Sequence, residues 1–138
     1  MAAKEVYKQI YTSFKMKTPL FETDEITFKI VEGILIGNWK AESIDLPLVH
    51  KIINYRLKIQ DGKSYPLLTN IKSVKESTKA ARDYLASKEG CQGVSKAAII
   101  ISSPVSKMIA NFFILASHPL IPTKMFTNEA EAKRWLMN

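Results

Sequence analysis

The most strongly apolar part of the chain lies between residues 96 and 136. It opens with Ala97 to Ile101, a short run that is β-branched at its end, as expected of a strand buried on both faces of a parallel sheet. Ser103 followed by Pro104 is a helix-start signal, with a hydroxyl for the free amides and then a proline at the first helical position. Helical spacing continues from there and predicts an inward-facing stripe of Val105, Met108, Ile109, Phe112, Leu115 and Ala116.

This predicted helix is apolar nearly all round, because Phe113 and Ile114 widen the stripe. The positions left for water are Ser106, Lys107, Ala110, Asn111 and Ser117. A helix of this kind is normally covered on more than one side. Two interpretations stay open: either the helix is sandwiched between the sheet and a neighbouring helix, or its outer face contacts a second subunit or a lipophilic ligand, since large exposed apolar patches are rare.

The residues after this helix predict a short strand and a closing helix. Pro119 and Pro122 exclude helix between them, and Thr123 to Phe126 suits an edge strand. Asn128 with Glu131 three residues later has the spacing of a capping box, which predicts the start of the last helix.

The first half of the chain predicts a hairpin followed by alternating helices and strands. Residues 25–31 alternate between apolar and polar side chains, and residues 34–39 return after a turn at Glu32-Gly33. Asp45 and Asp61-Gly62 bound a helix whose inward stripe is expected to be Leu48, Val49, Ile52, Ile53 and Leu57, with Lys51, Arg56 and Lys58 outside or flanking it. After a strand at 65–71, Ser73 and Glu76 form a second capping-box pattern, which predicts that another helix begins there.

This order of elements predicts an α/β domain with a mixed sheet of four to five strands and about four helices. Strands that alternate with helices imply right-handed crossovers, so the later strands should run parallel. We assign residues 23–138 to this single domain. Residues 1–22 are an N-terminal arm whose conformation stays open, because its apolar spacing is helical while its residue types favour strand.

Composition narrows the functional classes. The net charge of +7 comes from twenty basic residues, but seventeen of them are lysines spread along the chain, which favours a solubilising surface over nucleic-acid binding. The single cysteine, Cys91, excludes an internal disulfide and favours a reducing compartment. The apolar runs are shorter than the ~20 residues that span a bilayer, and no secretion signal is present, so we expect a cytoplasmic protein.

Few residues have the type and spacing of a catalytic, metal-binding or cofactor-binding site. His50 and His118 have no neighbouring ligand set, and the glycines form no phosphate cradle, so we expect no metal, no cofactor and no catalytic residue. The stretch from Ser73 to Lys79 is the exception, because it follows a buried strand at the edge of the sheet where α/β domains bind ligands and partners. Ser77 and Thr78 are candidate phosphorylation sites there, beside Lys75, Lys79 and Arg82. The alternative is that both hydroxyls simply cap the helix or fill space.

The order of elements and several short motifs resemble the STAS/SpoIIAA-like domain superfamily, in particular an uncharacterised bacterial subgroup. The resemblance covers roughly residues 23–137 and rests on Ala81 to Ser87, Asn111-Phe112-Phe113, Pro119 with Pro122, and Phe126-Thr127 leading to Ala132 and Trp135-Leu136. It implies helices packed on a sheet, no enzymatic activity, and work through contacts with proteins or small ligands. In the anti-sigma-factor antagonists of this superfamily, an Asp-Ser-Ser/Thr-Gly motif at the corresponding helix start is phosphorylated by a partner kinase. Here that stretch reads Glu76-Ser77-Thr78-Lys79, and the lysine in place of glycine disfavours such a switch.

Three functional hypotheses follow. The first is a non-enzymatic interaction and regulatory module, dimeric through its own surface and contacting an unknown regulatory protein. The alternative is a carrier or sensor of a small lipophilic ligand, and the third is a phosphorylation-controlled anti-sigma antagonist. The expected partner or ligand face consists of Lys75, Lys79, Arg82, Met108, Asn111, Phe112, Phe113, Ile114 and Leu115.

Overall fold

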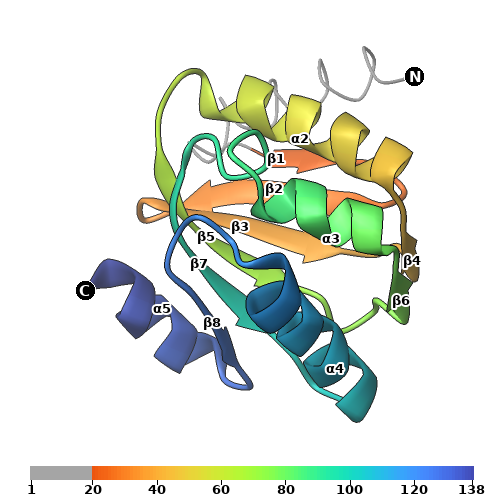
Figure 1. The fold of residues 1–138 in the computed structure, drawn as a ribbon. Helices are drawn as coiled ribbons and strands as arrows, with labels where there is room; N and C mark the ends of the chain where they lie inside the picture. The colour runs from red at the N-terminus through yellow and green to blue at the C-terminus, as the bar shows by residue number, and fades with distance from the viewer. Residues whose placement is uncertain (1–19) are drawn as a thin grey trace.

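The computed structural model describes residues 20–138, so most of the predicted arm lies outside the described residues. A six-stranded mixed sheet runs through the domain in the order β1-β2-β3-β5-β7-β8 (Figure 1). Its strands are β1 (Leu20–Glu22), β2 (Ile26–Val31), β3 (Ile34–Trp39), β5 (Tyr65–Asn70), β7 (Val94–Ile100) and β8 (Thr123–Phe126). The first three are antiparallel neighbours, and β3, β5, β7 and β8 are parallel. The α/β class and mixed sheet are confirmed, with one strand more than predicted because β1 at the end of the arm pairs with β2.

Helices cover both faces of this sheet. They are α2 (Leu46–Gln60), α3 (Lys79–Ala86), α4 (Pro104–Phe112) and α5 (Glu129–Met137). Three of them, α2, α3 and α4, share the larger core with one face of the sheet, whereas α5 packs on the other face (Figure 1). Alternation along the strands separates the two cores, because Leu67 and Ile99 join the first and Leu68 and Ile100 the second.

Most local start and stop signals are confirmed. The side chains of Asp45, Ser103 and Asn128 each accept a hydrogen bond from a backbone amide in the first turn of α2, α4 and α5. Asp61 ends α2 in the left-handed conformation. Glu32 and Gly33, with φ of 51° and 80°, form the turn between β2 and β3.

The predicted start of the second helix at Ser73 is wrong. The helix α3 begins at Lys79 with Thr78 as its N-cap. The preceding residues form β6 (Glu76–Ser77), which pairs in parallel with β4 (Ser43–Ile44) in a separate two-stranded sheet. The backbone amides of Lys75 and Glu76 both donate to the carbonyl of Glu42, so this tertiary pairing uses the groups that an earlier helix would need.

The predicted inward stripe of α4 is wrong except at Ile109, which packs against the main core. Ser106 and Ala110 are the buried residues of this helix. The Ser106 hydroxyl accepts from the backbone amides of Ser102 and Ser103, both at 3.0 Å, and donates to the Ser103 carbonyl. These bonds satisfy the buried serine, so its face can approach the core closely. The helix continues into a π-helical turn, η1 (Phe113–Ser117).

Candidate functional site

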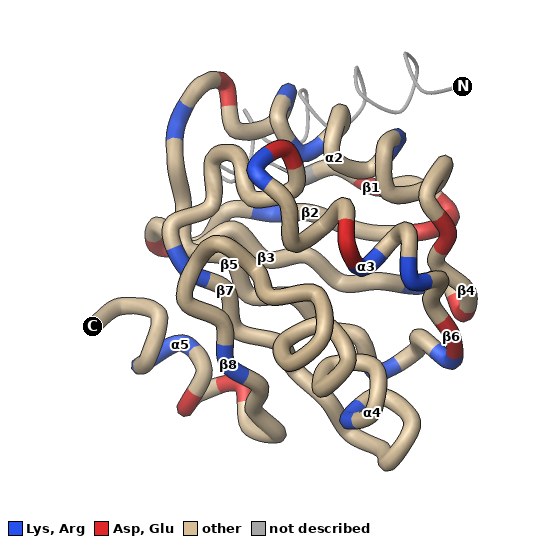
Figure 2. The backbone as a smooth tube through the Cα atoms, viewed as in Figure 1, with Lys and Arg blue, Asp and Glu red and all other residues tan. Residues whose placement is uncertain are grey.

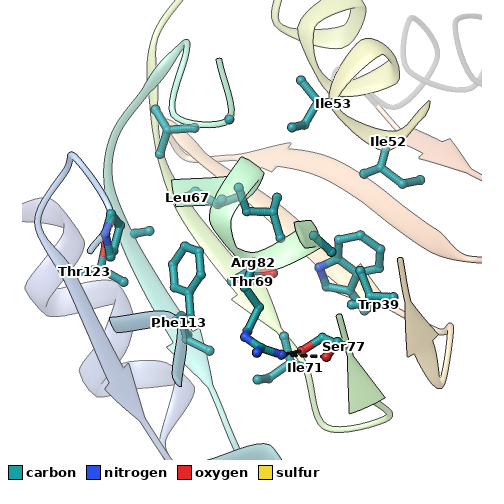
Figure 3. Close-up of a pocket in the computed structure, with 18 of the residues that line it drawn as sticks. Trp39, Ile52, Ile53, Leu67, Thr69, Ile71, Ser77, Arg82, Phe113 and Thr123 are labelled. Carbon is teal, nitrogen blue, oxygen red and sulfur yellow. Dashed lines mark hydrogen bonds between the residues drawn. The ribbon is translucent and has the colours of Figure 1, made fainter. Parts of the chain in front are cut away.

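A cavity of about 130 Å³ lies between the sheet and the helices α2, α3 and α4 (Figure 3). Its floor consists of alternate residues of β5 and β7, including Leu67, Thr69 and Ile99. The helices contribute Ile52, Ile53, Leu85, Ile109 and Phe113. Three of the wall positions are alanines, Ala81, Ala97 and Ala110, and these small side chains leave the space unfilled.

The wall is predominantly apolar, and its few polar groups lie toward its two ends. Thr69, Ser77 and Arg82 lie near the carboxyl end of β5 and the start of α3. Arg56 and Cys91 lie near the opposite end, beside the loop that precedes β7. Among the described residues that line the cavity there is no carboxylate and no imidazole.

Arg82 reaches from α3 to the strand before it (Figure 3). Its Nη1 donates to the Ser77 carbonyl at 2.6 Å and to the Ser77 Oγ at 2.9 Å. Its guanidinium also lies over the Phe112 ring, 5.3 Å from the centroid. These contacts hold a half-buried positive charge at the wall of the cavity.

Arg56 is only 4 % exposed, although the sequence predicted it outside or flanking the stripe of α2. Its guanidinium donates to the Gln60 side-chain oxygen, to the Gln92 carbonyl at 2.9 Å and to the Gly90 carbonyl at 3.1 Å. Burial lowers the pKa of Arg56 to about 10, while the neighbouring Cys91 raises it. Arg56 remains charged at neutral pH and holds the loop before β7 against α2.

The three cations predicted beside Ser77 and Thr78 make separate contacts and do not form one cluster. Lys75 lies before β6 and pairs with Glu42 at 3.3 Å, whereas Lys79 pairs with Asp83 at 2.7 Å. Arg82 alone turns to the cavity.

The two candidate phosphorylation sites do flank a helix start. Thr78 accepts a hydrogen bond from the amide of Ala81, and the Ser77 hydroxyl accepts from Arg82. Both hydroxyls therefore have structural contacts, and their phosphorylation stays a prediction.

The outer face of α4 and η1 carries an exposed apolar row, which we call the α4 stripe: Val105, Met108, Phe112 and Leu115. Their side chains are between 42 % and 69 % exposed. Of the other predicted surface residues, Asn111 is half-buried, and Phe113 and Ile114 pack against the main core. Lys107 is the one charged residue from 104 to 117, and Figure 2 shows the remaining basic positions dispersed over the other elements among acidic ones.

Sequence reasoning missed Arg56, Thr69 and the three alanines of the cavity. Arg56 could have been found, because it lies seven residues after Val49 and four after Ile52, on the same helical stripe. Ala97 was predicted in a buried strand, but no sequence signal indicated that the alanines would leave a space beside them. Among residues 20–138, no three His, Cys, Asp or Glu side chains form a metal-binding group.

A family model for a domain of unknown function, DUF7793, matches residues 28–138. The chain belongs to the DUF7793 family. Every cavity-lining residue except Ile26 lies within the matched part of this DUF7793 domain. No curated protein matches the chain in sequence.

The fold of the DUF7793 domain is SpoIIAA-like. It is similar to an uncharacterised protein of the DUF3478 family from Shewanella loihica PV-4, which has a SpoIIAA-like fold. The two are 12 % identical, with a TM-score of 0.50 over 86 % of this chain and 91 % of that one. A protein of unknown function from Arthrobacter sp. FB24 is 25 % identical over 80 % of this chain and 97 % of its own, with a TM-score of 0.31. The predicted resemblance to SpoIIAA-like proteins is confirmed for the fold.

No helix among residues 20–138 of the DUF7793 domain combines the length and the apolar character needed to cross a bilayer.

Proposed function

We propose that this domain is a non-enzymatic binding module whose internal cavity takes a small lipophilic ligand. The cavity between the sheet and the three helices carries this proposal. Protein interiors are packed as densely as organic crystals, and voids larger than a water molecule are few. About 130 Å³ of this apolar, partly open pocket is unfilled, and unfilled apolar space costs folding free energy.

A ligand that fills this space would recover part of that free energy. Apolar cavities of about 150 Å³ stay dry and accept molecules the size of benzene. Water is a poor occupant here, because most of the wall offers no hydrogen-bond partner. The chemistry and volume of the wall therefore favour a compact apolar molecule.

The same wall supports binding over catalysis. General acid–base catalysis needs a titratable group within hydrogen-bond reach of the reacting atoms. The described lining contains neither a carboxylate nor an imidazole, and Arg56 already donates to three acceptors.

Two measurements test the ligand proposal. Mass spectrometry of solvent extracts from natively purified protein should recover a bound apolar compound. Toluene should raise the melting temperature, because a ligand at 100 times its Kd stabilises the folded state by about 2.7 kcal/mol.

The control pair is Ala97→Leu, which fills the cavity, and Ala130→Leu, which makes the same change on the exposed side of α5. Only Ala97→Leu should abolish the response to toluene. Equal stabilisation of both variants would show that toluene binds elsewhere and would contradict the proposal.

The α4 stripe supports a second candidate function, self-association as a regulatory homodimer. Its four residues follow one another at intervals of three, four and three, the spacing of a helix–helix seam. Two copies of the stripe could pair across a two-fold axis and bury the same patch on each subunit. No charged side chain lies on the stripe itself to oppose this contact.

Multi-angle light scattering tests self-association. We expect a dimer in the wild type, and a monomer when Met108→Glu and Leu115→Glu are combined. Lys107→Glu is the control, because Lys107 is exposed on the same helix but off the stripe. A monomeric wild type at the highest soluble concentration would exclude this function.

A further inference from the structure

The two arginines in the cavity wall differ in how many of their donors the protein uses. Arg56 is buried and donates through both Nη1 and Nη2 to three acceptors. Arg82 is half-buried and makes both of its hydrogen bonds through Nη1, to a single residue, Ser77. Within residues 20–138, neither the Nη2 nor the Nε of Arg82 donates to a protein acceptor.

The charge of Arg82 acts on Asp83 at longer range but forms no direct salt bridge in the part of the chain that the structure describes. No carboxylate of residues 20–138 forms an ion pair with its guanidinium. Asp83, the next residue, pairs with Lys79 and accepts a hydrogen bond from Ser117. Arg82 is half-buried at the wall of the cavity, so its unused donors are placed to receive an anion there.

A second polar group of the cavity lining, Thr69, could also bind a ligand atom. Thr69, on the strand β5, lines the same cavity as Arg82 and Ser77 (Figure 3). Thr69 is half-buried in the lining of the cavity, and its hydroxyl makes no hydrogen bond with another described residue. A ligand that displaces water from this hydroxyl would have to offer it a hydrogen-bond partner.

We infer that the ligand carries a carboxylate, held by the Arg82 guanidinium with the Thr69 hydroxyl, while its apolar part fills the cavity. This inference rests on the proposed ligand-binding function. The planar guanidinium matches a carboxylate in geometry, and the Phe112 ring beneath it restricts its orientation. The volume of about 130 Å³ limits the apolar part to roughly the size of one benzene ring. The ligand class is therefore a small aromatic or short-chain carboxylic acid.

Isothermal titration calorimetry with a matched pair of probes, benzoate and the neutral benzamide, tests this assignment on the full chain. Wild type should bind benzoate about tenfold more tightly than benzamide, since a charge-assisted hydrogen bond contributes that much or more. Arg82→Gln should remove this preference and leave the affinity for benzamide within about twofold. Arg82→Lys, which keeps the charge and loses the planar fork, should retain only part of it.

The outcomes separate the two proposals. Equal binding of benzoate and benzamide by wild type would overturn the carboxylate assignment and leave the cavity as a site for neutral ligands. A preference for benzoate that survives Arg82→Gln would overturn the assignment of Arg82 as the group that holds the carboxylate. Failure of wild type to bind benzoate, benzamide or toluene would overturn the ligand-binding function and this inference with it. Retained benzamide binding by Arg82→Gln also shows that the variant is folded.

Discussion

Replacing Arg56 by methionine tests how the helix α2 is joined to the loop before β7. Methionine keeps most of the length and apolar volume of the arginine stem and removes the guanidinium. The substitution leaves three acceptors without their donor: the side-chain oxygen of Gln60 and the carbonyls of Gly90 and Gln92. Because the protein already destabilises the charged form of Arg56 by burying it, the sign of the effect depends on two opposing magnitudes.

The first magnitude is the relief of burying the charge. Burial that lowers the guanidinium pKa from its ordinary value to about 10 corresponds to roughly 3 kcal/mol against the charged folded form. The second is the loss of three hydrogen bonds to a charged donor, each worth about 1.5 to 3 kcal/mol. The hydrogen bonds exceed the relief, so we expect Arg56→Met to lower the free energy of unfolding by about 1.5 to 6 kcal/mol.

Urea denaturation followed by circular dichroism measures this loss as a shift of the midpoint at constant slope. Arg134→Met is the matched control, because Arg134 is exposed on α5 and the same change there should stay within about 0.5 kcal/mol. If Arg56→Met were as stable as Arg134→Met, water would have replaced the guanidinium at the three acceptors, and the claim that Arg56 holds the loop would fail.

Two further substitutions test the region around α3. Hydrogen bonds from Lys79 and then Ser117 lower the pKa of Asp83 below its ordinary 3.8, so its stabilising effect is complete above that pH and is lost as the pH falls below it. Asp83→Asn should therefore lower the melting temperature at neutral pH and flatten its decline below pH 3.8, and an unchanged acid profile would contradict this. Gly90→Ala should cost about 2 to 3 kcal/mol in urea denaturation, because the added Cβ would lie 2.6 Å from a backbone Cα of α3. Gly62→Ala, whose Cβ meets nothing within 4 Å, should cost only the strain of its φ of +79°, about 1 kcal/mol, and equal losses in both variants would refute the steric argument.

The features that could be predicted from the sequence depend on interactions between near neighbours in the chain. The Ser103–Pro104 start of α4 and the Asn128 start of α5 are satisfied within one turn of helix. The Glu32-Gly33 turn needs only its own backbone angles. The parallel position of β7 followed from its continuous apolar character, which suits a strand covered on both faces.

The failures come from longer-range competition. Ser73 and Glu76 have the residue types of a capping box, but the carbonyl of Glu42, more than thirty residues earlier, accepts from the amides of Lys75 and Glu76. Pairing of β4 with β6 therefore delays the helix to Lys79. Local patterns give the intrinsic preference of a segment, and tertiary hydrogen bonds can override it.

The orientation of α4 was not predicted for another reason, which does not involve tertiary hydrogen bonds. This orientation also affects both proposed binding surfaces, the cavity and the α4 stripe. A prediction from periodicity places the large apolar side chains on the inward face of a helix. In α4 the small Ser106 and Ala110 face the core, and the α4 stripe faces outward. With Met108 and Phe112 turned inward, their side chains would occupy the space beside Ala110 and leave no large apolar row on the surface. The orientation of α4 about its own axis therefore accounts both for the cavity beneath it and for the exposed α4 stripe. Burying small side chains while large apolar ones stay exposed lowers the folding stability. Such exceptions to the usual pattern are expected at sites where a protein binds a ligand or a partner.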